Sequence, residues 1–182
     1  KRILFNINSD GGTIDGVEEL ANKIRGLGKE TIAYTSGSMN SAAYWIGSAS
    51  TRLVASSSAS VGSVGVYAVV TDVSEQAKAM GINVRIYRSD ELKGIGVPGL
   101  PITEAQDAYL QKSVMDAANS FKASVKMKRT MVADADLNGG TMSGKEAAAK
   151  GLVTGLADSL KILLGQLEGT ASQGIQAKAF KK

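Results

Sequence analysis

Residues 31–49 read TIAYTSGSMNSAAYWIGSA, and this stretch sets the fold class of the chain. Its first five residues, 31–35, are apolar or β-branched and predict a buried strand. A Ser36-Gly37-Ser38 turn follows, and residues 41–49 then predict a short helix. A buried strand that leads through a tight turn into a helix is typical of layered α/β proteins.

The segments on both sides of this stretch continue the alternation. Residues 3–7 predict a buried strand, and Thr13 or Asp15 can cap a helix that runs to about Arg25. Residues 52–55 predict a third strand. Strands and helices that alternate at this spacing favour an α/β fold with a mostly parallel sheet and flanking helices.

Further elements are expected after residue 60. Thr103 and Gln106 form a capping box for a long helix that reaches about Met131. The remaining expected elements are a glycine-rich segment at 61–66 that runs into an apolar stretch at 67–70, a helix from 71 or 72 to 80, a strand at 82–87, and helical segments at 143–150 and 158–167. We expect one domain over residues 1–167 and a flexible polar tail over residues 168–182.

The composition removes several classes of function. The chain has no histidine and no cysteine among its 182 residues, so zinc, iron–sulfur and haem ligation are not expected. No Asp-x-Asp-x-Asp loop is present to bind Ca²⁺, and we expect neither a metal nor a cofactor. The net charge of +4 is scattered, and aromatic residues make up only 5% of the chain, which argues against a nucleic-acid partner.

No stretch of the sequence is typical of a membrane span. None approaches the roughly 18 consecutive apolar residues that such a helix requires, and no signal peptide is present. The chain starts directly in a strand pattern without a methionine, so we expect a fragment or a processed form of a longer protein.

Ser41 is the first candidate for chemistry, because it lies where a turn gives way to a helix. The N–H groups at a helix N-terminus are unpaired and the dipole there is positive, which are conditions that stabilise an oxyanion. Gly11 or Gly12, in a turn after the first strand, can bring a second N–H donor close. The alternative is that Ser41 is simply the N-cap of its helix, a position that serine favours.

A nucleophilic serine in this chain needs a base other than histidine. Arginine stays protonated in proteins, so the base would be a lysine held neutral by dry, apolar surroundings. Lys93, in a glycine-rich loop, reads on its own as a solvated lysine, and we expect Asp90 and Glu91 to face solvent. Ser63, between two glycines, is either a turn residue or a hydroxyl that orients a lysine amine.

A series of stretches, taken in order, resembles the signal peptide peptidase A family of Ser-Lys peptidases, and within it most closely the phage capsid-assembly protease branch. The stretches are INSDGG at 7–12, NSAAYWIGSA at 40–49, ASVGSVGV at 59–66, LKG at 92–94 with Pro98 and Thr103-Glu104 after it, and TMSGKEAAAKGLVTGLAD at 141–158. The resemblance covers about residues 1–160.

The resemblance implies a ClpP/crotonase-like fold and assigns a role to each candidate. Ser41 would be the nucleophile, Lys93 the general base and Ser63 the hydroxyl that orients the lysine. The backbone N–H groups of Gly12 and Ala42 would form the oxyanion hole. The resemblance also implies a homo-oligomeric ring in which the serine and the lysine come from neighbouring subunits.

The chain departs from the family pattern at three places. Asp10 stands where the family usually has proline before the two glycines, and Ala42-Ala43 stand where the bacterial enzymes have Gly-Gly. The strand and helix that usually precede the first strand of this match are missing from it.

The function expected from this resemblance is that of a serine endopeptidase. In a phage setting it would cleave scaffold, portal or capsid proteins of a prohead in the host cytoplasm. The alternatives are a membrane-associated bacterial signal peptide peptidase whose anchor lies outside this chain, and a non-catalytic structural ring protein with the same fold. An acyl-CoA enzyme of the crotonase type is disfavoured, because it needs no Ser-Lys pair.

Overall fold

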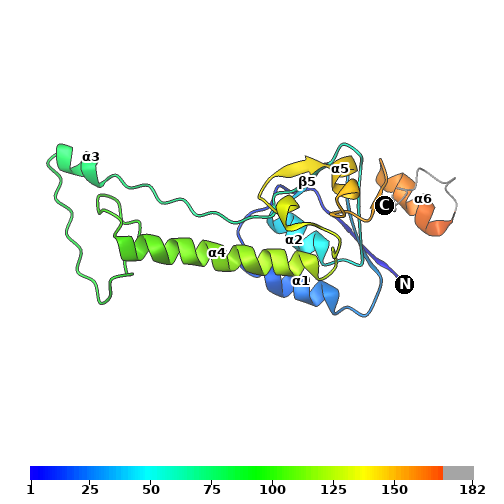
Figure 1. The fold of residues 1–182 in the computed structure, drawn as a ribbon, viewed down its shortest axis with the longest axis horizontal. Coiled ribbons are helices and arrows are strands. Elements are labelled where there is room, and N and C mark those ends of the chain that lie inside the picture. The colour runs from blue at the N-terminus through cyan, green and yellow to red at the C-terminus, as the bar shows by residue number, and fades with distance from the viewer. Residues whose placement is uncertain (170–182) are drawn as a thin grey trace. The chain divides into compact units, whose positions relative to one another are not determined.

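The computed structural model describes residues 1–169, which form two compact units. Within the described residues, unit 1 comprises Lys1–Gly65 together with residues 119–169, and unit 2 comprises Val66–Ala118. Helix α4 (Glu104–Lys126) is continuous and contributes residues to both units (Figure 1). The chain therefore leaves unit 1 after residue 65 and returns to it along a helix.

The larger sheet of unit 1 has four parallel strands in the order β1-β2-β4-β7. These strands are β1 (Ile3–Asn6), β2 (Thr31–Thr35), β4 (Arg52–Ala55) and β7 (Gly155–Leu156). In the register, Phe5 pairs with Ala33 and Ala33 with Leu53, and Ala55 pairs with Leu156. The predicted α/β class with mostly parallel strands is confirmed.

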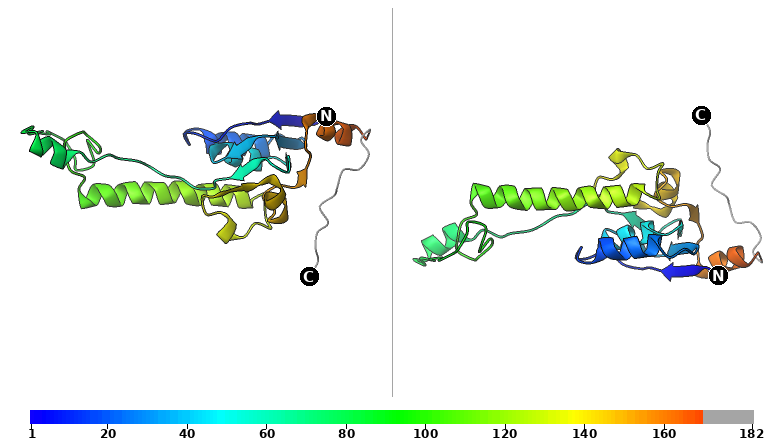
Figure 2. Two further views of the ribbon diagram at one scale, coloured as in Figure 1. Left: turned by 90° about the horizontal axis from the view of Figure 1, so that it is seen from above. Right: turned by 90° about the horizontal axis from the view of Figure 1, so that it is seen from below.

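The two faces of this sheet carry separate cores, because successive strand residues point to opposite sides. Ile32, Tyr34 and Val54 pack with Leu163 of α6 (Leu160–Glu168) on one face. Figure 2 shows α6 beside the start of β1, where Arg2 donates from Nη1 to the carbonyl of Leu167 at 3.0 Å.

The opposite face is covered by helices. Ala33 and Leu53 belong to a core shared with α1 (Val17–Arg25) and α2 (Ala42–Ser48), and these two helices pack against each other (Figure 1). The last part of α4 joins this core, where Phe121 stacks on Trp45 with ring centroids 4.5 Å apart. Flanking helices on both faces are thus confirmed.

A second sheet of three strands lies at the carboxyl end of this layer and carries the candidate site. Its order is β3-β5-β6, with β3 (Ser38–Asn40), β5 (Ser60–Gly62) and β6 (Thr141–Ser143). Strands β3 and β5 are parallel, and β5 and β6 are antiparallel. The segment after β1 also reaches this sheet, because Ser9 forms an isolated parallel bridge with Met39.

The C-terminal part of unit 1 is short and tightly packed. A 3-10 turn (Asp134–Asp136) precedes β6, and α5 (Gly144–Ala149) begins directly after it. Ser143 caps α5 by accepting from the N–H of Glu146 at 3.2 Å. A Cβ at Gly144 would lie 2.0 Å from the carbonyl oxygen of Ser56, so only glycine fits the start of this helix.

Unit 2 contains α3 (Ser74–Ala79), a loop over 80–103 and the first part of α4. The predicted capping box at the start of α4 is confirmed. The N–H of Gln106 donates to Thr103 Oγ1 at 3.3 Å, and the N–H of Thr103 donates back to Gln106 Oε1 at 3.2 Å.

Several sequence-based boundaries are wrong. The strand predicted at residues 82–87 is absent, because a strand needs a hydrogen-bonded neighbour and no described segment supplies one. Helix α1 has Gly16 at its N-cap in a left-handed conformation, in place of Thr13 or Asp15. Helix α4 ends at Lys126, not near Met131, because the chain turns to bring buried Arg129 against Ser50.

The predicted tail begins inside a folded element. Glu168 is the last residue of α6, and Gly169 is its left-handed C-cap. Residues 170–182 lie outside the described part of the chain.

Candidate active site

Ser41 lies between β3 and α2 in an unusual backbone conformation, with φ 52° and ψ −127°. It is one of two non-glycine residues with positive φ among residues 1–169. Although Ser41 occupies the N-cap position, its side chain makes no capping hydrogen bond. Ser41 therefore stands at the N-cap without the side-chain bond that a serine cap usually makes, and the residue is half-buried.

The backbone around Ser41 is fixed from both sides. Its N–H donates to the carbonyl of Gly62 on β5 at 2.9 Å, and its carbonyl accepts from the N–H of Trp45 at 2.9 Å. These bonds hold a conformation that an L-residue adopts only at a cost of about 1–3 kcal/mol. A strained strand-to-helix turn that exposes a serine hydroxyl is also the geometry of the nucleophile elbow in other hydrolases.

The predicted glycine turn packs directly against Ser41. Gly11 has φ +108°, and a Cβ at this position would lie 2.6 Å from Ser41 Cβ and 3.1 Å from Ala42 N. Only glycine allows this approach. The next residue, Gly12, has a backbone N–H that donates to no acceptor within residues 1–169.

Ala42 offers the second donor predicted for the oxyanion hole. The bond from Trp45 N–H to Ser41 O is the first of α2, so the N–H of Ala42 precedes the helical ladder and has no intrahelical partner. The predicted donors thus belong to two segments that meet at Ser41. Their role in binding an oxyanion stays a prediction.

A network of hydrogen bonds links the segment that contains Ser41 with the segment that contains Gly11. Asn40 is buried, and its Nδ2 donates to Ser60 Oγ at 3.0 Å and, over a longer distance of 3.4 Å, to Asp10 Oδ1. The N–H of Asn40 also donates to the carbonyl of Ser9 at 3.1 Å. A hydrogen bond therefore links Asn40, which precedes Ser41, to Asp10, which precedes the two glycines.

Ser63 is the second serine with positive φ, at 52°. Its N–H donates to the carbonyl of Gly140 at 2.7 Å, and it directly follows Gly62, whose carbonyl holds Ser41. Ser41 and Ser63 therefore belong to neighbouring strand ends of the same sheet. The role of Ser63 in orienting a lysine is an expectation from the resemblance.

Lys93 lies in unit 2, and its side chain is exposed in this chain. Its N–H donates to the carbonyl of Asp90 at 3.0 Å, and Asp90 and Glu91 are exposed as predicted. Gln106 is buried and donates from Nε2 to the carbonyl of Glu91 at 2.7 Å. The capping box of α4 therefore also fixes the loop that carries Lys93. The pairing of Lys93 with Ser41 stays a prediction.

Sequence reasoning missed the residues that hold α2 in place. The hydroxyl of buried Tyr44 donates to the carbonyl of Leu152 at 2.8 Å, and burial raises the pKa of this phenol well above its usual value. The guanidinium of Arg129 is buried and donates from Nη2 to the carbonyl of Ser50, beyond the end of α2. Burial lowers the pKa of Arg129, although the nearby Tyr44 opposes that shift.

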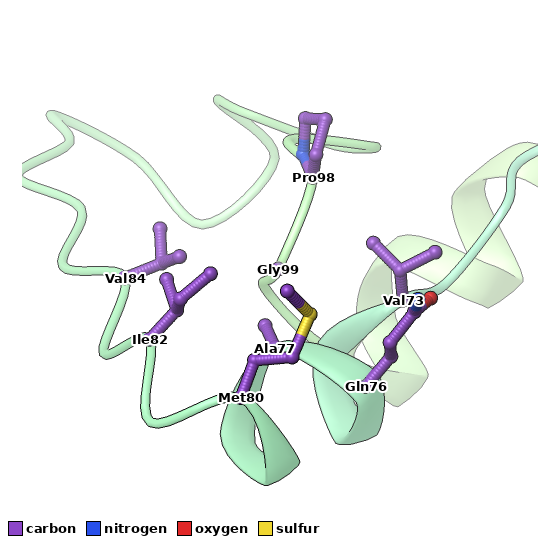
Figure 3. Close-up of a pocket in the computed structure, with 8 residues that line it drawn as sticks. All are labelled: Val73, Gln76, Ala77, Met80, Ile82, Val84, Pro98 and Gly99. Carbon is purple, nitrogen blue, oxygen red and sulfur yellow. The ribbon is translucent and has the colours of Figure 1, made fainter.

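A separate pocket of about 220 Å³ lies within unit 2 (Figure 3). It is lined by Val73, Gln76, Ala77, Met80, Ile82, Val84, Pro98 and Gly99. None of these side chains titrates or acts as a nucleophile, so the pocket offers no catalytic group.

The described residues hold neither a metal-binding cluster nor a membrane-spanning helix. No group of three or more acidic residues in the described chain is placed to hold a metal ion. No helix among residues 1–169 has the length and apolar character of a membrane span.

The fold and the site together define a class of protein. In a mostly parallel α/β fold, a serine with strained backbone stands at a helix N-terminus, and its side chain makes no capping bond. A glycine turn lies against that serine. This is the arrangement of a serine hydrolase. Residues 23–165 match peptidase family S49, and the chain belongs to this family.

The curated relatives carry protease names. The chain is 32% identical over 158 residues to a putative protease of Methanocaldococcus jannaschii, covering 84% of this chain and 51% of the relative. It is 28% identical to the putative signal peptide peptidase SppA of Enterococcus faecium, covering 84% of this chain and 46% of the relative. It is 27% identical to protease 4 of Salmonella typhi, covering 87% of this chain and 26% of the relative.

The chain thus spans about half or less of the length of these curated relatives. Among solved structures, a mutant of a membrane-bound stomatin-specific protease in complex with a substrate peptide matches with a TM-score of 0.45 and 15% identity. That match covers 90% of this chain and 64% of the other. The sequence-based assignment to a peptidase family related to signal peptide peptidase A is confirmed.

Proposed function

We propose that this chain is the catalytic part of a serine endopeptidase in which Ser41 is the nucleophile and Lys93 the general base. The observation that carries the proposal is the conformation of Ser41. The residue is held at positive φ with its hydroxyl uncapped and Gly11 against its Cβ. A serine that served only the fold would relax into a capping geometry.

The proposed chemistry follows from these groups. Ser41 Oγ attacks a peptide carbonyl carbon while neutral Lys93 Nζ accepts the hydroxyl proton. The N–H groups of Gly12 and Ala42 hold the oxyanion that forms on the carbonyl oxygen. Lys93 then gives its proton to the leaving amine, and water hydrolyses the acyl-enzyme. Ser63 is proposed to orient the amine of Lys93.

The exposure of Lys93 suggests which assembly state of the protein is catalytically active. A general-base lysine needs desolvation to become neutral, and Lys93 is exposed in the single chain. We therefore propose that the active form is a homo-oligomer in which a neighbouring copy covers the Lys93 loop. The apolar side chains exposed on unit 2, including Tyr67 and Tyr87, support self-association.

The substrates are proposed to be proteins with small or apolar residues before the scissile bond, because the small apolar residues Ala42 and Ala43 directly follow Ser41. Resemblance to the phage branch favours scaffold, portal or capsid proteins of a prohead. The named signal peptide peptidase relative favours the alternative, which is the cleavage of leftover signal peptides at a bacterial membrane. A second candidate function is a structural ring without catalysis.

The test compares the wild-type chain with Ser41→Ala and Lys93→Arg on casein and on a phage scaffold protein. Arginine keeps the positive charge of Lys93 but cannot release its proton, so it separates base catalysis from charge. We expect Lys93→Arg to lower kcat/KM by roughly 10²–10⁴-fold, and Ser41→Ala to lower it at least as much. Exposed Lys128, in unit 1, provides the control variant Lys128→Ala, which should cleave normally.

The alternatives give different results. Cleavage that persists in Ser41→Ala would contradict the proposed mechanism. A wild-type chain that assembles into rings but cleaves neither substrate would favour the structural ring. Preference for a signal peptide over the scaffold protein, measured as kcat/KM, would favour the membrane-associated setting.

A further inference from the structure

We infer that Asp10 selects substrates that carry a lysine or arginine close to the scissile bond. This inference rests on the proposed function of Ser41. Asp10 lies two residues before Gly12 of the proposed oxyanion hole. The inference states that the protein prefers substrates with a positive charge near Asp10. The selected residue is one other than that directly before the scissile bond, which is proposed to be small or apolar.

The placement of Asp10 follows from two independent paths along the chain. Asp10 directly precedes Gly11, whose Cβ position lies 2.6 Å from Ser41 Cβ. Its Oδ1 also accepts from Nδ2 of Asn40 at 3.4 Å, and Asn40 directly precedes Ser41. The carboxylate of Asp10 is therefore hydrogen-bonded to the residue directly before Ser41, and the backbone of Asp10 is one residue from the contact between Gly11 and Ser41.

The carboxylate of Asp10 is held in place by Asn40, and one of its oxygens is left free by the described residues to bind a substrate cation. Asn40 is buried and is held in turn by Ser60 Oγ at 3.0 Å, so it forms a fixed support. Asp10 itself is exposed, and within residues 1–169 it forms no ion pair. Its second oxygen, Oδ2, accepts no hydrogen bond from the described residues.

A negative charge at this place opposes catalysis unless it is balanced. The oxyanion formed during attack is itself negative, and like charges that are close together repel. A cationic substrate side chain next to Asp10 offsets that repulsion and adds an attraction of its own.

The experiment uses fluorogenic peptides based on a casein site that the wild-type chain cleaves. At each of the three positions on either side of the bond, except the one directly before it, the residue is set to lysine, glutamine or glutamate. We expect the lysine peptide to exceed the glutamine peptide by about threefold in kcat/KM at the favoured position, as for an exposed ion pair. Asp10→Asn should abolish that preference, and Asp10→Lys should shift it to glutamate.

Asp15 provides the matched control, since it is an exposed carboxylate in the same loop. Asp15→Asn should keep the lysine preference. The preference in the wild-type chain should also weaken between 0.05 and 0.5 M NaCl, values chosen to span Debye lengths from above to below about 10 Å.

Failure of this inference is distinguishable from failure of the proposed function. If the wild-type chain cleaves peptides with the same preference as Asp10→Asn, the inference is overturned and the peptidase assignment stands. An equal loss on all peptides in Asp10→Asn would also overturn it, because Asp10 would then serve the site's structure. If the wild-type chain cleaves nothing, the affinities of Ser41→Ala and of Ser41→Ala/Asp10→Asn for labelled polyalanine peptides with one central lysine or glutamine decide the question. Equal affinities for the two peptides would reject it.

Discussion

The most informative single residue is Ser41, because its backbone and its side chain point to the same conclusion. A positive φ is costly for serine, and the helix gains no capping bond in return. The surrounding bonds to Gly62 and Trp45 hold this strained state. Strain that is held at a reactive side chain is typical of functional sites.

Gly11 provides the test at the scale of residues. Gly11→Ala would place a methyl group 2.6 Å from Ser41 Cβ and force an alanine to φ +108°. We expect a loss of unfolding free energy of about 1–3 kcal/mol. Because Ser41 must move, we also expect kcat to fall by roughly tenfold or more. Urea unfolding and casein cleavage measure the two effects.

Gly155 is a suitable control for that variant. A Cβ there meets no atom within 4 Å, so Gly155→Ala should change stability by only about 0.5 kcal/mol and leave cleavage intact. Normal cleavage by Gly11→Ala would show that the glycine turn does not set the position of Ser41.

At the scale of elements, α2 is the part of the site that needs support. The helix has only seven residues, Ala42–Ser48, which is too short to be stable by itself. Tyr44, Trp45 and Arg129 attach it to the rest of unit 1 through a hydroxyl bond, a ring stack and a guanidinium bond. The position of Ser41 therefore depends on buried contacts along the whole helix.

The raised pKa of Tyr44 gives a prediction about pH. Since the folded chain favours the neutral phenol, the unfolded chain loses this proton first as pH rises above about 10. The stability that Tyr44 contributes is therefore complete below pH 10 and decreases above it. Tyr44→Phe should cost about 1–2 kcal/mol at pH 7, because Leu152 loses its hydroxyl donor.

The difference between the two proteins should shrink with rising pH. We expect it to decrease by up to about 1.4 kcal/mol per pH unit above pH 10, measured by urea unfolding at pH 9, 10 and 11. Tyr34, whose pKa is also raised by burial, is present in both proteins and cancels. A constant difference over this range would show that Tyr44 ionises as readily in the folded chain as in the unfolded one.

At the scale of the whole molecule, unit 2 exposes large apolar side chains of the kind that favour association with another protein chain. Tyr67 is 85% exposed and Tyr87 is 90% exposed, and both belong to segments outside the helices and strands of residues 1–169. Exposed apolar side chains favour association with another chain. This supports the proposed homo-oligomer.

Sedimentation velocity tests that proposal over a range of protein concentrations. We expect the wild-type chain to sediment as an oligomer and the double variant Tyr67→Ser/Tyr87→Ser to shift towards the monomer and lose cleavage activity. Met131, which is 87% exposed in unit 1, provides the control variant Met131→Ser. A wild-type chain that stays monomeric and active would contradict an oligomeric active form.

The sequence by itself determined the class of the fold and the family. Buried strands such as 31–35 and the capping box at Thr103 depend on neighbouring residues, whose pattern is visible along the chain. The order of the motifs that include Ser41 is also visible along the sequence, and the family match confirmed the peptidase assignment. The strand expected at 82–87 was wrong because strand pairing depends on a partner, which the pattern of one segment does not reveal.

Only the tertiary structure decided how Ser41 is held. The contact with Gly11, the support of Asn40 by Ser60, and the anchoring of α2 by Arg129 each join residues at least 20 positions apart. The backbone of Ser41 is held by the distant carbonyl of Gly62 on β5 as well as by the local bond from Trp45. The physical reason is that local preference favours a relaxed serine cap, whereas long-range hydrogen bonds and packing supply the free energy that overrides it.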